Sequence, residues 1–132
     1  MQTLRTAAVG RNAPAGGRAM IDSYTFGRMV IDGRVYQADL MIVSGQVQAG
    51  WWRREGHLVE VEDVTDILAA RPEILVVGTG SPGQMRVSDT LARTLRDLAI
   101  ELVEQPTPAA TATYNQLAAQ GRNAAAAFHL TC

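Results

Sequence analysis

The sequence predicts an α/β domain of three layers, in which a central mixed β-sheet follows an N-terminal antiparallel hairpin or meander. Two observations predict this class. The first half of the chain reads as consecutive short strands separated by two-residue turns. In the second half, short apolar strands alternate with helical patterns, which is typical of parallel strands joined by right-handed crossovers. The 132 residues fit one domain, and we expect a flexible arm over 1–20 and a single domain over 21–132.

The strongest local signal in the first half is a hairpin. Residues 26–31 have the composition of a strand, Asp32-Gly33 is typical of a type I′ turn, and 35–40 supplies the partner strand. The chain stays apolar up to a second turn at Ser44-Gly45. Residues 47–52 are the next strand candidate, so the strands of this half are expected to pair antiparallel.

The second half alternates helices and strands. Each predicted helix starts at a side chain suited to capping and continues with apolar residues at helical spacing. The predicted caps are, in chain order, Asp63, Ser88 and Thr107. The intervening strands are short and almost wholly apolar, as expected for strands buried on both faces. They span 74–77, 100–103 and 124–130.

Composition excludes several classes of function. The formal net charge is -1 and all 12 basic residues are arginine, so bulk electrostatics does not attract nucleic acid, and no lysine is present for a Schiff base or a P-loop. Cys132 is the only cysteine, which excludes an internal disulfide and a zinc site of several thiolates. We find no signal-peptide core and no apolar run long enough for a membrane span. We therefore expect a cytoplasmic protein with no nucleic-acid partner, no membrane insertion and no cofactor.

A glycine motif follows the apolar strand 74–77. Gly78, Gly80 and Gly83 spell G-x-G-x-x-G, and acids follow about twenty residues later, as in the dinucleotide-binding fingerprint. However, Pro82 lies inside the motif and the next helix signal begins only at Ser88, too far for a helix N-terminus to face a pyrophosphate. We favour a tight strand exit that glycine permits. A small-ligand or anion site at this loop is the alternative, and NAD is the least favoured reading.

Five separated stretches carry a family resemblance, in the order IDSYTFGRMVIDGRVYQADLMI, WWRREGH, PEILVVGTG, PTPAATATYNQL and HLTC. They resemble the uncharacterised family that includes mitochondrial complex I assembly factor three and the adipogenesis-associated domain protein. The resemblance implies a compact three-layer α/β fold with a central mixed sheet and a flanking β-hairpin. It does not imply an enzyme, because no catalytic activity is established for such domains. The mitochondrial relatives assist assembly of a respiratory complex through protein contacts, whereas the bacterial relatives are hypothetical proteins. This chain shows no targeting presequence, so we group it with the bacterial members and carry over no partner.

The candidate pocket residues come from the glycine loop, from an aromatic and basic stretch and from the last helix. They are Gly78, Thr79, Gly80, Trp52, Arg53, His57 and Asn115. An aromatic face beside a guanidinium group recognises anions, bases or peptides. In the more ordinary reading, one Trp packs in the core, the other covers a sheet edge, and the arginines are solvated. Strand alternation sends Trp51 and Trp52 to opposite faces and favours that reading, whereas the resemblance, in which Trp-x-x-x-x-His recurs, points to Trp52 and His57.

Four further polar residues have structural readings. Asp39 lies in an apolar run, so it is either an edge residue in water or paired with an arginine inside. The resemblance places an acid at this position and favours the pair. His129 and Cys132 are three residues apart, which points their side chains to opposite faces of a regular strand. We therefore predict neither a metal site nor catalytic residues, and we read Thr107 as a helix cap.

The leading hypothesis for function is a non-enzymatic protein-interaction domain that resembles assembly factors. It follows from the resemblance and from the lack of a complete catalytic constellation. The alternative is a small-ligand or anion-binding domain, or an enzyme acting on such a ligand, with its pocket at the Gly78-Thr79-Gly80 loop. A homodimer through the exposed hairpin edge is also open, because unpaired strand edges invite pairing.

Overall fold

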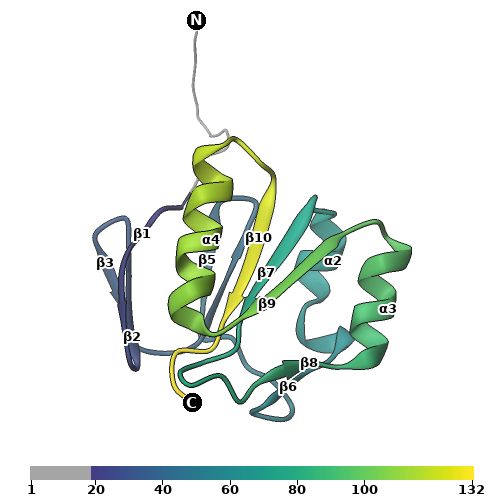
Figure 1. The fold of residues 1–132 in the computed structure, drawn as a ribbon, viewed down its shortest axis with the longest axis horizontal. Coiled ribbons are helices and arrows are strands. Elements are labelled where there is room, and N and C mark those ends of the chain that lie inside the picture. Colours follow the sequence, from purple (N-terminus) through teal and green to yellow (C-terminus); the bar gives the residue numbers. More distant parts are fainter. Residues whose placement is uncertain (1–18) are drawn as a thin grey trace, which may run out of the picture.

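The computed structural model describes residues 19–132 and arranges them in three layers (Figure 1). The first 18 residues of the predicted arm lie outside the described residues. Ala19 is only 3% exposed and packs into the core, and the amide of Met20 donates to Asp32 Oδ1 at 3.2 Å. Packed residues of the domain are therefore described from Ala19 onward.

A five-stranded mixed sheet forms the central layer. Its strands, in the order in which they pair, are β5 (Gln46–Ala49), β4 (Leu40–Val43), β10 (Ala124–Phe128), β7 (Ile74–Gly78) and β9 (Glu101–Gln105). β7, β9 and β10 are mutually parallel, whereas β4 runs antiparallel to both of its neighbours. The carboxyl ends of the parallel strands therefore meet at one edge of the sheet, together with the start of β4, since Leu40 pairs with Phe128. This carboxyl edge, at the lower end of the sheet in Figure 1, is where open α/β sheets usually bind ligands.

The N-terminal strands form a separate antiparallel sheet. It consists of β1 (Ile21–Thr25), β2 (Arg28–Ile31) and β3 (Arg34–Tyr36). The predicted turns are confirmed: Asp32-Gly33 and Ser44-Gly45 have positive φ at both residues, as a type I′ turn requires. The predicted strand 26–31 is wrong at its start, because Gly27, with φ of 77°, turns the chain between β1 and β2. Glycine alone adopts that angle without strain.

The helices occupy the second half, as predicted. They are α2 (Thr65–Ala70), α3 (Asp89–Asp97) and α4 (Thr107–Ala119), with a 3-10 turn η1 (Val61–Asp63) and a two-stranded parallel pair of β6 (Leu58–Val59) and β8 (Arg86–Val87). The Ser88 cap is confirmed, since its Oγ accepts from Leu91 N at 3.1 Å. The Asp63 cap is wrong. Asp63 closes η1 by accepting from Glu60 N at 2.8 Å, and α2 begins only after Val64.

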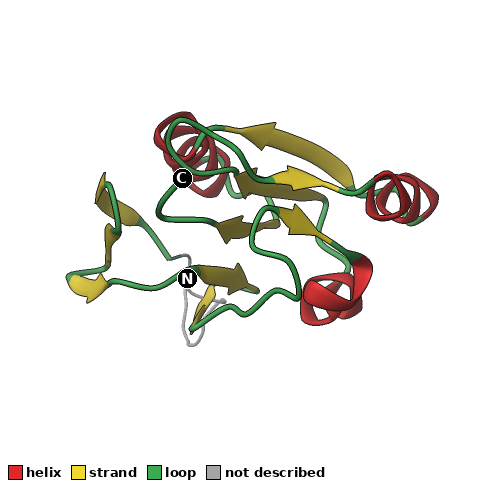
Figure 2. Cartoon of the chain, turned by 90° about the horizontal axis from the view of Figure 1, so that it is seen from below, coloured by secondary structure: helices red, strands yellow, loops and turns green. Residues whose placement is uncertain are grey.

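Alternate residues of the central strands build two cores on opposite faces of the sheet. Val76 and Ala126 pack against α4 and the N-terminal sheet, whereas Leu75 and Ala127 pack against α2 and α3. Strands covered on both faces read as continuous apolar runs, which is why 74–77 could be recognised from the sequence. Figure 2, which views the carboxyl edge, shows α4 and α2 on either side of the strands. Across residues 19–132, no helix has the length and apolar character needed to cross a bilayer.

Candidate functional site

An ionic cluster of Asp39, Arg53 and His129 lies at the carboxyl edge of the sheet. Asp39 precedes β4, Arg53 lies in the loop after β5, and His129 follows β10. Asp39 Oδ2 accepts from Arg53 Nη2 at 2.8 Å and from His129 Nδ1 at 2.8 Å. The second oxygen, Oδ1, accepts from the amide of Leu130 at 2.8 Å. One carboxylate thus joins three segments that lie far apart in the sequence.

The cluster is largely withdrawn from water. The side chains of Arg53, His129 and Asp39 are 5%, 8% and 18% exposed, and buried charges are tolerated only when paired. Burial raises the pKa of Asp39, but hydrogen bonds from His129, the Leu130 amide and Arg53 outweigh it and hold that pKa below its ordinary value. An ionised carboxylate only accepts, so the His129 tautomer carries its proton on Nδ1. Of the two readings of Asp39, the internal pair with an arginine is confirmed.

Arg53 also fixes the loop over residues 51–57. Its Nη2 and Nε donate to the carbonyl of Gly56 at 2.8 and 3.2 Å, which closes the loop on itself. The guanidinium carbon lies 4.5 Å from the centre of the Trp51 ring, a cation–π contact. Trp51 is 7% exposed and its Nε1 donates to the carbonyl of Asp63 at 2.8 Å. The buried side chains of Trp51 and Arg53 therefore anchor this loop to the rest of the domain.

Two nitrogens of the cluster have no hydrogen-bond partner within residues 19–132. They are Arg53 Nη1 and His129 Nε2, and both atoms are buried. An unpaired buried polar group costs about 1–3 kcal/mol, and such groups in native proteins call for a functional or structural explanation. The exposed His57 ring stands edge-on to the His129 ring, with 5.6 Å between ring centres. In the tautomer that donates from Nδ1, His129 Nε2 is an acceptor, whereas Arg53 Nη1 is a donor.

The glycine loop receives the chain that follows β10. Gly80 has φ of 102°, and a Cβ there would lie 2.3 Å from the Thr131 carbonyl oxygen and 2.8 Å from His129 Cδ2. The amide of Ser81 donates to the same carbonyl of Thr131 at 3.0 Å. α3 begins only at Asp89, so the helix that follows the glycines in the chain does not start on them as in the dinucleotide fingerprint. These glycines serve a close approach between two segments of this chain, as expected of a tight strand exit.

Thr107 joins the glycine loop to the end of β10. Its hydroxyl donates to the carbonyl of His129 at 2.6 Å and accepts from the amide of Gly80 at 2.9 Å, and the residue is fully buried. The prediction that Thr107 caps α4 is therefore wrong: Pro106 is the N-cap residue and Thr107 begins the helix. In the sequence, a threonine before an apolar helix suits either a helix cap or a buried residue that bonds to other segments. Only the burial of Thr107 in the structure distinguishes these two roles.

The structure brings some of the predicted pocket residues together and separates others. Arg53 and His57 both contact His129, which lies beside Gly80. Gly78 and Thr79 are buried where β7 ends. Trp52 is 76% exposed. The amide of Asn115 is committed elsewhere, since it holds both the N–H and the carbonyl of Ile21 at 2.9 and 2.8 Å. Asn115 therefore pins β1 to α4.

Asp39 and His129 were not among the predicted site residues, although the sequence carried a signal for them. An acid in an apolar run and a histidine at the end of a buried strand each need an internal partner. Cys132 is exposed, and its carbonyl accepts from the Gln84 amide at 3.3 Å. In the part of the chain that the structure describes, no three His, Cys, Asp or Glu side chains gather as metal ligands.

A sequence model of a family described as "Protein of unknown function (DUF498/DUF598)" matches residues 21–129. The chain belongs to this family. The match spans nearly all of the folded part, and it confirms that the resemblance noted in the sequence leads to an uncharacterised domain family.

Several solved structures are similar to this chain. Conserved hypothetical protein PH1505 from Pyrococcus horikoshii OT3 is 26% identical, with a TM-score of 0.73, over 85% of this chain and 98% of that chain. XCC1710 from Xanthomonas campestris is 22% identical, with a TM-score of 0.74, over 92% of both chains. A Bordetella pertussis protein described as a Mth938-like domain is 21% identical, with a TM-score of 0.66, over 91% of this chain and 90% of that chain. These likenesses confirm the three-layer fold.

Proposed function

We propose that this domain is a non-enzymatic interaction module that binds a partner protein through Trp52. The observation that carries the proposal is a contrast within three consecutive residues. Trp52 is 76% exposed, whereas Trp51 on one side is 7% exposed and the Arg53 side chain on the other is 5% exposed. A large indole in water between two buried neighbours is the kind of side chain that dominates protein interfaces.

The loop holds Trp52 in a defined position. The amide of Trp51 donates to the carbonyl of Asp39 at 2.8 Å, and Arg53 is joined to both Asp39 and Gly56. Binding through a loop that is already ordered avoids much of the entropy that a flexible loop would lose. The ionic cluster thus acts as the base on which Trp52 is presented.

The charges beside Trp52 indicate what the partner offers. Arg54 and His57 are exposed, and Arg54 makes no ion pair within residues 19–132. Glu55 lies between them in the chain. The partner of this loop would provide an apolar socket for the indole and a carboxylate for Arg54 at its rim. This arrangement suits an assembly-factor-like role, in which the domain holds another protein without changing it chemically.

The test compares three forms of the full-length protein in affinity purification from its own cells, with quantitative mass spectrometry. Trp52→Ala removes the proposed anchor, and Phe26→Ala removes another exposed aromatic side chain, which is 61% exposed. We expect at least one partner that wild type and Phe26→Ala recover equally and that Trp52→Ala recovers at least tenfold less, because an anchor of this type contributes about 2 kcal/mol or more. Thermal midpoints of both variants should match wild type. Equal recovery with Trp52→Ala, or no reproducible partner, would remove the proposal.

A second candidate function is the binding of a small anion beside the same cluster. The buried Arg53 Nη1, a donor with no hydrogen-bond partner within residues 19–132, favours it. Thermal unfolding with nucleotides, dinucleotides, sugar phosphates and carboxylates tests this function, since a ligand at a hundred times its Kd adds about 2.7 kcal/mol to stability. A rise in midpoint that disappears in His57→Gln, a change at an exposed side chain, would support it. Absence of any rise would exclude it. Gly80 is unsuitable for this test because any side chain there meets Thr131.

A further inference from the structure

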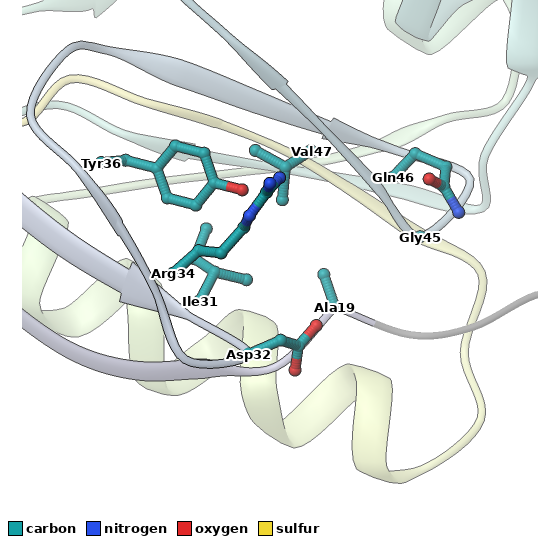
Figure 3. Close-up of a pocket in the computed structure, with 8 residues that line it drawn as sticks. All are labelled: Ala19, Ile31, Asp32, Arg34, Tyr36, Gly45, Gln46 and Val47. Carbon is teal, nitrogen blue, oxygen red and sulfur yellow. The ribbon is translucent and has the colours of Figure 1, made fainter.

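A concave region lies between the three-stranded and the five-stranded sheet, at the end of β4 away from Asp39. It has a volume of about 320 Å³ and is bounded by β3 on one side and by the turn between β4 and β5 on the other (Figure 3). The residues that line it are Ala19, Ile31, Asp32, Arg34, Tyr36, Gly45, Gln46 and Val47. This volume is at the lower end of the range for small-molecule pockets.

The cavity exists because small residues stand where larger ones would fill it. Gly45 has no side chain, and Ala19 contributes a single methyl group. Ala19 and Ile31 lie beneath the cavity and, at 3% and 1% exposed, offer it almost no surface. Val47, which is half-buried, forms a wall. The apolar surface available to a ligand is therefore on the side of the cavity lined by Val47 and Tyr36.

Two polar side chains of β3, Arg34 and Tyr36, line this cavity. The side chain of Arg34 extends across the cavity toward Val47, and the Tyr36 hydroxyl points into the same space (Figure 3). Arg34 makes no ion pair within residues 19–132. Asp32, only two residues away, lies at the other end of the cavity, where its Oδ1 accepts from Met20 N at 3.2 Å. Among residues 19–132, neither the guanidinium of Arg34 nor the hydroxyl of Tyr36 has a hydrogen-bond or ion-pair partner, so both can bind a ligand.

We propose that this cavity binds a small monocarboxylate with an apolar body. The Arg34 guanidinium would donate two parallel hydrogen bonds to the carboxylate, with Tyr36 as a further donor, while the body lies against Val47. One arginine and the nearby Asp32 carboxylate favour a single negative charge over the double charge of a phosphate. With about 30 Å³ of liquid volume per water-sized group, the cavity has room for a ligand of about ten non-hydrogen atoms.

Phenylacetate is a probe of the right size and charge, and it can be tested on the full-length chain by titration followed with ¹H–¹⁵N NMR spectra. We expect saturable shifts at the amides of Ile31, β3 and Gln46–Val47. Affinity for phenylacetate should exceed that for neutral phenylacetamide at least tenfold, as expected for a charge-assisted hydrogen-bonded pair. Inorganic phosphate should bind more weakly than phenylacetate, because it has no apolar body.

Matched variants locate the site. Arg34→Gln should lower the affinity for phenylacetate at least tenfold and Tyr36→Phe severalfold, whereas Arg28→Gln, at an exposed arginine on β2 outside the cavity, should leave it unchanged. The affected side chains are at least partly exposed, so the spectra of all three variants should otherwise overlay on wild type. Absence of saturable shifts at these amides, equal affinity for phenylacetamide or phosphate, or an unchanged Arg34→Gln variant would each overturn the proposal.

Discussion

Asp39→Asn is the substitution that tests the structural role of the ionic cluster most directly. It keeps the size of the side chain but removes the negative charge that Arg53 and His129 share. The Arg53 cation, 5% exposed, would remain buried without a counter-charge. Breaking a buried ion pair on one side costs about 3–5 kcal/mol. We expect about 3 kcal/mol, the lower end, because the Asp39 side chain keeps 18% exposure.

The expected loss is large enough to measure by two methods. For a domain of this size, 1 kcal/mol corresponds to a change in Tm of about 4 °C, so thermal unfolding by circular dichroism should show a Tm about 12 °C lower. Urea unfolding should show a lower midpoint with an unchanged m value, since the folded surface area stays the same. The fluorescence of the buried Trp51 reports that transition.

The control is an ion pair of the same length in a different environment. Arg122 Nε and Glu73 Oε1 are also 2.8 Å apart, but their side chains are 41% and 56% exposed. Solvent screens such pairs, so Glu73→Gln should leave the midpoint unchanged within error. If Asp39→Asn lowered stability by less than about 1 kcal/mol, the range of exposed pairs, the idea that the cluster anchors the carboxyl edge would be refuted.

Three further predictions follow from contacts at the same edge. The pKa of Asp39 in the folded protein lies below its ordinary value, so between these two pKa values the unfolded chain binds more protons than the folded one. The urea midpoint should therefore fall as the pH drops from about 4 through the folded pKa. A parallel fall in Asp39→Asn would contradict the assignment of this effect to Asp39. Gly80→Ala should lower the free energy of unfolding by about 1–3 kcal/mol because of the φ of 102° alone, and by more because the new Cβ contacts Thr131. In thermal unfolding, the control Gly56→Ala should be close to neutral, since a Cβ there meets nothing within 4 Å. Equal midpoints for the two variants would count against the close approach of Thr131 to Gly80. Thr107→Val should cost about 1–3 kcal/mol by leaving the Gly80 amide unpaired, while Thr107→Ser keeps the hydroxyl and should be milder in urea unfolding; a reversed order would refute the hydrogen-bonding role.

Local signals in the sequence were reliable where the chain's own neighbours decide the conformation. The Asp32-Gly33 and Ser44-Gly45 turns were recognised because positive φ at two successive residues restricts the choice of side chains. The Ser88 cap was recognised because its partner, the Leu91 amide, lies three residues away. In each case the interaction is completed within a few residues, so spacing alone predicts it.

Errors arose where two local readings were equally good and distant segments chose between them. Asp63 and Thr107 both suit a helix cap, yet Asp63 closes a 3-10 turn and Thr107 bonds to a loop 27 residues away. Similarly, Gly80 in its G-x-G-x-x-G loop has the spacing of a phosphate site, but its neighbours are occupied by the chain around Thr131. The spacing of residues in the sequence does not show which distant segment will pack against a loop.

The sequence by itself determined the fold class, because the periodicity of apolar residues and the turn residues depend on local geometry. It also indicated that Asp39 needs an internal partner, because a carboxylate in an apolar run is costly alone. Only the tertiary structure shows which residues are the partners of Asp39. Antiparallel pairing of β4 with β10 and with β5 places the start of β4 beside the ends of both neighbours, and this brings His129 and Arg53 to the one carboxylate of Asp39.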